Sequence, residues 1–160
     1  MPLAFHPMDE ASARAILSWR YDPPYDVYNL RSDEADDVVG YFLDPQNNFH
    51  RITDERGNLV ACCSFGPDGQ VPGGDYAADA LDIGLGLRPD LTGQGRGLDT
   101  VNSVLDFARL TFAPGAFRVT VAEFNQRALR VWERAGFHPV QTFRGGRDQR
   151  AFVVLIREKS

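Results

Sequence analysis

Apolar positions recur with two different spacings along this chain, and each spacing predicts one type of secondary structure. Spacings of three and four residues predict helices at about 9–19, 32–44, 95–111 and 125–135. Alternating or short continuous apolar runs predict strands at about 3–5, 49–53, 58–65, 81–87, 117–121, 140–143 and 151–156. The order of these elements indicates a mixed α/β (α+β) fold, with one sheet and helices packed on its faces.

Single residues mark the ends of several predicted helices. Asp9, Ser32 and Asn125 each precede a helical stretch. We expect them to cap it, because their side-chain oxygens can accept a bond from a backbone N–H. Gly136 follows the last predicted helix, where a residue with positive φ is favoured. These signals place the helix ends independently of the apolar spacing.

The composition narrows the class of protein. A chain of 160 residues, 43% hydrophobic and 24% charged, is expected to form a single domain over residues 1–160. The net charge of −5 disfavours a nucleic-acid surface. It is consistent with solubility or with a cationic substrate such as an amine, and does not choose between them. No apolar run reaches the roughly 18 residues of a membrane span, and residues 1–10 lack the pattern of a secretion signal. We therefore expect a cytoplasmic protein without a nucleic-acid or membrane partner.

The two cysteines, Cys62 and Cys63, are adjacent in the chain. Neighbouring residues of a strand point to opposite faces, so a disulfide between them is not expected. One adjacent pair also supplies too few ligands for a cysteine-based metal site, and we expect no metal. Both residues are interpreted as small core residues of a reduced, cytoplasmic protein.

An aromatic segment, defined here as residues 19–30, follows the first predicted helix. It contains Trp19, Tyr21, Tyr25 and Tyr28, and its two prolines end the helix. One interpretation is a loop whose rings pack over the core. The other is a wall of an acceptor pocket, where Tyr25 and Tyr28 offer a substrate both an apolar face and a hydroxyl group.

The most informative stretch runs from an apolar strand at 81–87 through Pro89 to Gly93, Gly95 and Gly97. Alternating glycines let successive backbone N–H groups face one concavity, and the following helix adds the positive end of its dipole. The product is a cradle for an anion such as phosphate. It is not a P-loop, since no Gly-Lys-Ser/Thr follows, and its glycine spacing differs from that of the dinucleotide-binding motif.

The residues around this turn, Leu-Gly-Leu-Arg-Pro-Asp-Leu-Thr-Gly-Gln-Gly-Arg-Gly at 85–97, resemble the acetyl-CoA-binding motif of the GNAT N-acetyltransferases. The segment from Asn125 to Phe137 is similar to the second signature of that family, in which an asparagine opens a helix that ends in Gly-Phe. The two motifs occur in the family's order, and the predicted elements match the family fold. The resemblance implies a twisted, mostly antiparallel sheet whose two central strands splay apart around acetyl-CoA.

The resemblance also implies roles for individual residues. The backbone of Leu85 and Leu87 should bind the pantetheine arm of the cofactor, and the Asn125 side chain should contact that arm. The pyrophosphate should be held by backbone N–H groups of Gly93, Gln94, Gly95, Arg96, Gly97 and Leu98. Two positions depart from the family pattern. Thr92 stands where Arg or Gln is usual, and Trp132 stands where many members have a Tyr that protonates the leaving thiolate, so we expect Trp132 to pack on the cofactor instead.

A carboxylate near the acceptor is needed to take the proton that an amine must lose before it attacks. Asp82 is the candidate catalytic residue, because it lies between two apolar residues in the strand expected to line the cofactor. Glu123, near the end of a later strand, is the alternative. The backbone N–H of Leu87 is expected to stabilise the oxyanion.

These observations predict an N-acetyltransferase that uses acetyl-CoA, without a metal, to acetylate a primary amine by direct attack. The acceptor is expected to be a small molecule or a protein N-terminus. A non-catalytic acyl-CoA-binding or regulatory domain on the same fold is the alternative, and a nucleotide-binding protein unrelated to CoA is a third interpretation. Dimers are common among similar proteins, so a homodimer is a further expectation.

Overall fold

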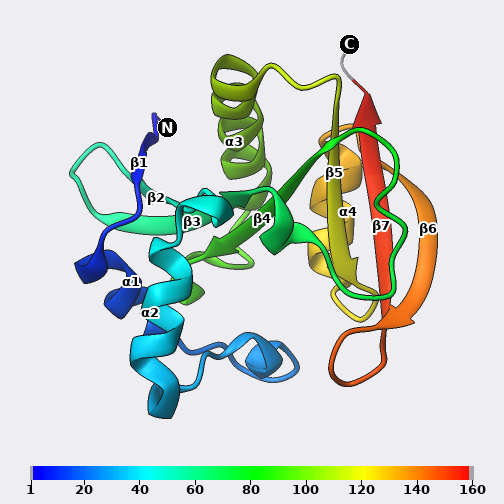
Figure 1. The fold of residues 1–160 in the computed structure, drawn as a ribbon. Coiled ribbons are helices and arrows are strands. Elements are labelled where there is room, and N and C mark those ends of the chain that lie inside the picture. Colours follow the sequence, from blue (N-terminus) through cyan, green and yellow to red (C-terminus); the bar gives the residue numbers. More distant parts are fainter. Residues whose placement is uncertain (1, 159–160) are drawn as a thin grey trace.

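The computed structural model describes residues 2–158, which fold around one seven-stranded sheet (Figure 1). The strands are β1 (Ala4–Pro7), β2 (His50–Thr53), β3 (Leu59–Phe65), β4 (Leu81–Leu87), β5 (Ala116–Ala122), β6 (His138–Gly145) and β7 (Arg150–Glu158). Their order across the sheet is β1-β2-β3-β4-β5-β7-β6. Every neighbouring pair is antiparallel except β4 and β5, which are parallel. The predicted mixed, mostly antiparallel sheet is therefore confirmed.

Four α-helices cover the two faces of this sheet, α1 (Glu10–Leu17), α2 (Ala35–Leu43), α3 (Gly97–Phe112) and α4 (Gln126–Arg134). Ile16 of α1 and Phe42 of α2 pack in one core with Cys62. The adjacent Cys63 belongs to a second and larger core, which contains Val104 of α3. Since neighbouring residues of a strand face opposite sides, α1 and α2 lie on one face of the sheet and α3 and α4 on the other.

The helix ends follow the predicted signals with one exception. The carboxylate of Asp9 and the amide oxygen of Asn125 each accept a bond from the backbone N–H three residues later, at 2.8 and 3.0 Å. Gly136 has a φ of 97°, as expected at the end of α4. Ser32 instead begins a short 3-10 helix before α2 and caps no α-helix. Within the described residues, no helix is both long and apolar enough to cross a membrane.

The central strands β4 and β5 pair only where β4 begins. Leu81 pairs with Phe117 and Asp82 with Arg118, and no later residues of the two strands pair with each other. Figure 1 shows the two strands diverging from this point, while β4 stays bonded to β3 and β5 to β7. We call the opening between them the splay gap and the paired end its vertex. The predicted splay of the central strands is confirmed.

The connection of residues 66–80 joins β3 to β4 and packs against β5 and the turn between β6 and β7. The Tyr76 hydroxyl lies 2.8 Å from Oγ1 of Thr120 in β5. The backbone N–H of Gly146, in the turn between β6 and β7, donates to the Pro72 carbonyl at 3.1 Å. These contacts fix a long connection to the strands beyond the splay gap.

Candidate active site

The glycine turn, residues 92–97, follows β4 and a 3-10 helix (Pro89–Leu91) and leads into α3. Gly93 and Gly95 have φ values of 72° and 74°, which glycine adopts without strain. Within the described chain, the backbone N–H groups of residues 93–98 have no hydrogen-bond acceptor, and no side chain caps α3. Unpaired N–H groups and the positive end of the α3 dipole suit this turn to an anion.

The side chains of the glycine turn stabilise the turn itself. Thr92 Oγ1 donates to the backbone carbonyl three residues earlier at 2.7 Å, and Gln94 Nε2 donates to the one four residues earlier at 2.6 Å. Gly97 lies against α4, since a Cβ atom on it would lie 3.2 Å from a methyl group of Val131. The side chains of Thr92 and Gln94 are therefore used within the turn, and its backbone N–H groups are left to bind a ligand.

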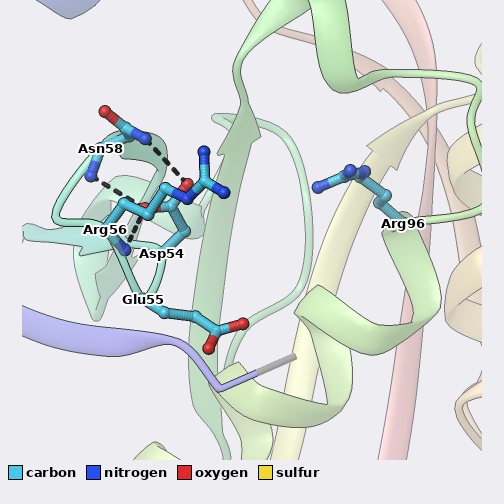
Figure 2. A pocket seen from close by; sticks show the side chains of 5 residues that line it. All are labelled: Asp54, Glu55, Arg56, Asn58 and Arg96. Carbon is cyan, nitrogen blue, oxygen red and sulfur yellow. Dashed lines mark hydrogen bonds between the residues drawn. The ribbon is translucent and has the colours of Figure 1, made fainter.

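A surface pocket of about 380 Å³ lies beside the turn (Figure 2), and its walls are Asp54, Glu55, Arg56, Asn58 and Arg96. Figure 2 shows the Arg96 side chain extending from the start of α3 toward Arg56 in the turn between β2 and β3. Arg96 therefore gives its side chain to this pocket and its backbone N–H to the glycine turn. Two acidic and two basic side chains line this pocket, so their formal charges cancel.

The bonding pattern of β4 decides which of its backbone groups face the splay gap. The Asp82 carbonyl accepts a bond from the residue after β3, and the Arg88 N–H donates to a β3 carbonyl, both at 2.9 Å. In an antiparallel pair such bonds recur at every second residue, so the even-numbered residues of β4 bond to β3. The backbone N–H and carbonyl groups of Leu85 and Leu87 therefore point into the gap, as the resemblance to the acetyltransferases implies for a cofactor-binding strand.

The same alternation of bonded residues applies to β5, on the opposite side of the gap. The N–H of Glu123 donates to a β7 carbonyl at 2.9 Å, so the odd-numbered residues of β5 bond to β7. The backbone groups of Thr120 and Ala122 therefore face the gap. Two unpaired strand edges face each other across the gap, and both can bond to an extended ligand that carries amide groups.

The aromatic segment spans the open end of the splay gap. Tyr21 donates its hydroxyl proton to the Leu87 carbonyl at 2.7 Å, at the end of β4. Tyr28 accepts a bond from Nδ2 of Asn125 at 3.2 Å, just beyond the end of β5. The two tyrosine rings meet edge to face, with centroids 6.5 Å apart. The segment therefore both packs on the protein and forms a wall of the gap, so the two interpretations of its rings are compatible.

The structure brings Asn125 and Tyr28 together, although the sequence suggested a cofactor role for one and an acceptor role for the other. The amide oxygen of Asn125 caps α4, and its NH₂ group donates to the Tyr28 oxygen. The phenolic proton of Tyr28 is not used in this bond. Burial raises the pKa of Tyr28 above its ordinary value, so its hydroxyl is protonated at neutral pH.

Trp132 lies in the core beneath α4 and is 6% exposed. Its ring packs edge to face against Phe137, with centroids 5.0 Å apart. Most of the indole surface is thus covered by the protein itself. A contact between Trp132 and a cofactor stays a prediction, and the core position accounts for an aromatic residue at this site.

Asp82 lies at the vertex of the splay gap and is 3% exposed. Its two carboxylate oxygens accept bonds from Nε and Nη2 of Arg118 at 2.6 and 2.7 Å, and Gln70 donates to the second oxygen at 2.9 Å. Hydrogen bonding to this carboxylate raises the pKa of Arg118, which is also buried. The geometry favours a structural role for Asp82 over the expected role as a base. The alternative base, Glu123, is exposed and follows β5.

Sequence reasoning missed Asp68, which lies in the 66–80 connection. Tyr41 donates its hydroxyl proton to Oδ1 at 2.5 Å, and Ser64 donates to Oδ2 at 2.6 Å. A Cβ atom on Gly84 would lie 2.9 Å from Oδ2, so the carboxylate rests on the backbone of β4 near the vertex. In the sequence Asp68 stands in a Pro-Asp-Gly turn signal. The glycine opposite it in β4 was the feature that could have pointed to a group packed on that strand.

Comparison with known proteins adds to this geometry. A family model described as the acetyltransferase (GNAT) family matches residues 12–137. The chain belongs to this family. No curated protein matches the chain by sequence. Among solved structures, a spermidine N-acetyltransferase chimera from Vibrio cholerae and hSSAT has a TM-score of 0.75 at 16% identity, with 98% of this chain and 95% of that one covered.

Two further solved structures share the fold. A GNAT-family acetyltransferase from Bacillus anthracis has a TM-score of 0.73 at 13% identity, and covers 98% of this chain and 94% of its own. The spermidine N-acetyltransferase of Vibrio cholerae in complex with CoA and spermine has a TM-score of 0.67 at 16% identity, with coverage of 98% and 95%. At these identities the likeness supports the GNAT fold, and the chemistry must be argued from the residues of this chain.

Neither cysteine of this GNAT domain is placed to act as a nucleophile. Burial raises the pKa of the Cys62 thiol to about 12 and holds that of Cys63 well above its ordinary value. We expect iodoacetamide at pH 7.5 to leave both thiols of the native protein unmodified and to alkylate both in urea, as measured by intact mass. Rapid labelling of the native protein at either position would contradict this. The expected result excludes an acetyl-cysteine intermediate at neutral pH.

Proposed function

We propose that this chain is an N-acetyltransferase that transfers the acetyl group of acetyl-CoA to a primary amine by direct attack. The observation that carries the proposal is the continuity of two binding surfaces. The anion-binding glycine turn follows directly on β4, the strand whose unpaired backbone lines the splay gap. A ligand that joins a diphosphate to an extended chain of amides fits both surfaces at once, and acetyl-CoA has that form.

The glycine turn and the splay gap are assigned to different parts of acetyl-CoA. The N–H groups of residues 93–98 are assigned to the diphosphate, and the backbone groups of Leu85 and Leu87 to the amide-bearing arm. Because Tyr21 already bonds the Leu87 carbonyl, Leu87 offers its N–H, which we assign to the oxyanion. Bound acetyl-CoA supplies a thioester carbonyl, which the amine attacks as the CoA thiol leaves.

Two side chains near the gap hold or accept protons for this reaction. Asp68 is a partly exposed carboxylate beside β4, and each of its oxygens retains a lone pair after bonding Tyr41 and Ser64. We assign it to the ammonium proton of the acceptor. Tyr28 keeps its phenolic proton free next to Asn125, and we assign that proton to the leaving thiolate in place of the tyrosine that Trp132 replaces.

A cationic amine suits the charge around the acceptor side. Residues 22–44 contain seven acidic side chains and one basic one, which is a net charge of −6 against −5 for the whole chain. These residues include most of the aromatic segment and α2, on the face of the sheet that holds Asp68. A negative surface there concentrates cations near the gap. The neighbour bound to CoA and spermine is a spermidine acetyltransferase, which supports the same class of acceptor.

The direct test is turnover. The protein is incubated with acetyl-CoA and a panel of amines, namely a polyamine, an amino acid, an aminoglycoside and a peptide with a free N-terminus. Release of CoA thiol and the mass of the product are then measured. We expect amine-dependent thiol release, fastest with the polyamine. Binding of acetyl-CoA without transfer to any amine would favour the non-catalytic acyl-CoA-binding domain, and stabilisation by ATP but not by CoA would favour a nucleotide-binding protein.

Asp68→Asn tests the assigned proton acceptor. We expect kcat to fall by about two to four orders of magnitude, the usual contribution of general acid–base catalysis, with the Kd for acetyl-CoA unchanged. Asp79→Asn, an exposed carboxylate of the same 66–80 connection, is the matched control and should retain activity. A folded Asp68→Asn enzyme with the kcat of the wild type at every pH would eliminate Asp68 as the base.

A further inference from the structure

Arg127, in the first turn of α4, lies between the glycine turn and the aromatic segment. Its Nη1 atom is 3.3 Å from the position that a Cβ atom on Gly93 would occupy. Its guanidinium carbon lies 4.2 Å from the centre of the Tyr25 ring, within the range of a cation–π contact. One half-buried side chain therefore reaches from α4 to both sides of the mouth of the splay gap.

The charge of Arg127 has no partner in the described part of the chain. No carboxylate lies within 4.0 Å of it, whereas Arg14, Arg31, Arg88, Arg109 and Arg118 each form an ion pair. Tyr25 supports the guanidinium and is itself packed against Phe124, with ring centroids 6.0 Å apart. The arginine is thus held in place by an aromatic face, and its hydrogen-bonding groups are available to an anion.

Arg96 is the positively charged residue within the glycine turn, but its side chain is exposed and extends toward the neighbouring surface pocket (Figure 2). Thr92 and Gln94 are uncharged and are bonded to local carbonyl groups. Backbone N–H groups alone bind a diphosphate without neutralising its charge. Arg127 is a half-buried cation that adjoins Gly93 of this turn.

We infer that Arg127 is the side chain that binds the diphosphate of the acyl donor, and that Tyr25 is its positioning residue. This inference rests on the proposed function, because it takes the anion at the glycine turn to be the diphosphate of acetyl-CoA. A guanidinium donates two parallel bonds to phosphate oxygens, which an ammonium cannot do. The arginine on α4 thereby supplies the charge that Thr92 does not.

The test compares Arg127→Ala with Arg130→Ala, an exposed arginine of the same helix. Calorimetry measures Kd for CoA, for 3′-dephospho-CoA and for pantetheine, which lacks the diphosphate. We expect Arg127→Ala to raise the Kd for CoA and for 3′-dephospho-CoA tenfold or more and to leave the Kd for pantetheine unchanged. The Kd for CoA should also depend less steeply on salt concentration than in the wild type. Arg130→Ala should bind all three as the wild type does. Circular dichroism and the melting temperature of each variant report its folding.

Other results would contradict either the role of Arg127 or the proposed function. A loss seen with CoA but not with 3′-dephospho-CoA would place Arg127 at the 3′-phosphate and overturn the inference, as would equal losses for pantetheine or no loss at all. Tyr25→Leu should weaken the binding of CoA by less than Arg127→Ala does. In the double variant it should have little further effect, since both substitutions act through the Arg127 guanidinium. A wild-type protein that binds no CoA would instead refute the proposed function, and is recognised before any variant is made.

Discussion

Gly95→Asp is expected to abolish the stabilisation of this protein by acetyl-CoA. For the wild type, a ligand at one hundred times its Kd should add about 2.7 kcal/mol to the free energy of unfolding, which raises the melting temperature by several degrees. An aspartate at position 95 places a carboxylate beside the N–H groups that we assign to the diphosphate. Repulsion between like charges and the bulk of the side chain both oppose binding.

The backbone conformation of Gly95 makes a matched control necessary. Its φ of 74° strains any other residue, but so does the φ of 81° at Gly57, and an added Cβ meets nothing within 4 Å at either position. Gly57→Asp should therefore destabilise the free protein by a similar amount and still respond to acetyl-CoA. Thermal unfolding with and without ligand gives the comparison. An equal response in the two variants would mean that the glycine turn is not the diphosphate site.

Asp82→Asn is expected to destabilise the protein by about 3–5 kcal/mol, which lowers the melting temperature by roughly 10 °C. The change leaves the buried Arg118 guanidinium without a counter-charge in a site where water cannot replace it. Asp90→Asn, which breaks an exposed pair with Arg88, should cost far less because solvent screens that pair, and it is the control. Urea unfolding of both variants measures the difference.

The same variant separates two roles for Asp82. If Asp82 is structural, the substitution lowers stability, and the kcat of the protein that stays folded at low temperature changes little. If Asp82 is the base, the substitution leaves stability nearly intact and lowers kcat at neutral pH. An Asp82→Asn protein with the wild-type midpoint in urea and no turnover would therefore restore Asp82 as the catalytic carboxylate and contradict the assignment made from its ion pair.

The elements and the conformation of the glycine turn could be predicted because their signals are local. The alternating glycines at 93 and 95 and the asparagine at 125 each specify a backbone conformation within a few residues of themselves. The apolar spacing likewise placed α3 and β4 to within about two residues. Such features depend on the conformational preference of the chain, which the sequence carries directly.

The carboxylate best placed to accept a proton could not be predicted in this way, because the environment of each carboxylate depends on partners far away in the chain. Arg118, which is 36 residues from Asp82, turns a suitable base into half of a buried pair. Asp68 becomes a candidate only because Tyr41, 27 residues away, and the bare backbone of β4 meet it. The packing of distant strands and connections decides which carboxylate is buried and which stays partly exposed. A local sequence pattern does not predict that packing.

The ion pair at the vertex also bears on which ligand groups the splay gap can hold. The splay gap is open at the aromatic segment and ends where Asp82 and Arg118 join β4 to β5. The closed end of the gap is therefore made of two buried, charged side chains. An apolar ligand group that reached this end would exchange water for charge, which costs free energy. The gap can therefore hold hydrocarbon more readily toward its open end than at the vertex.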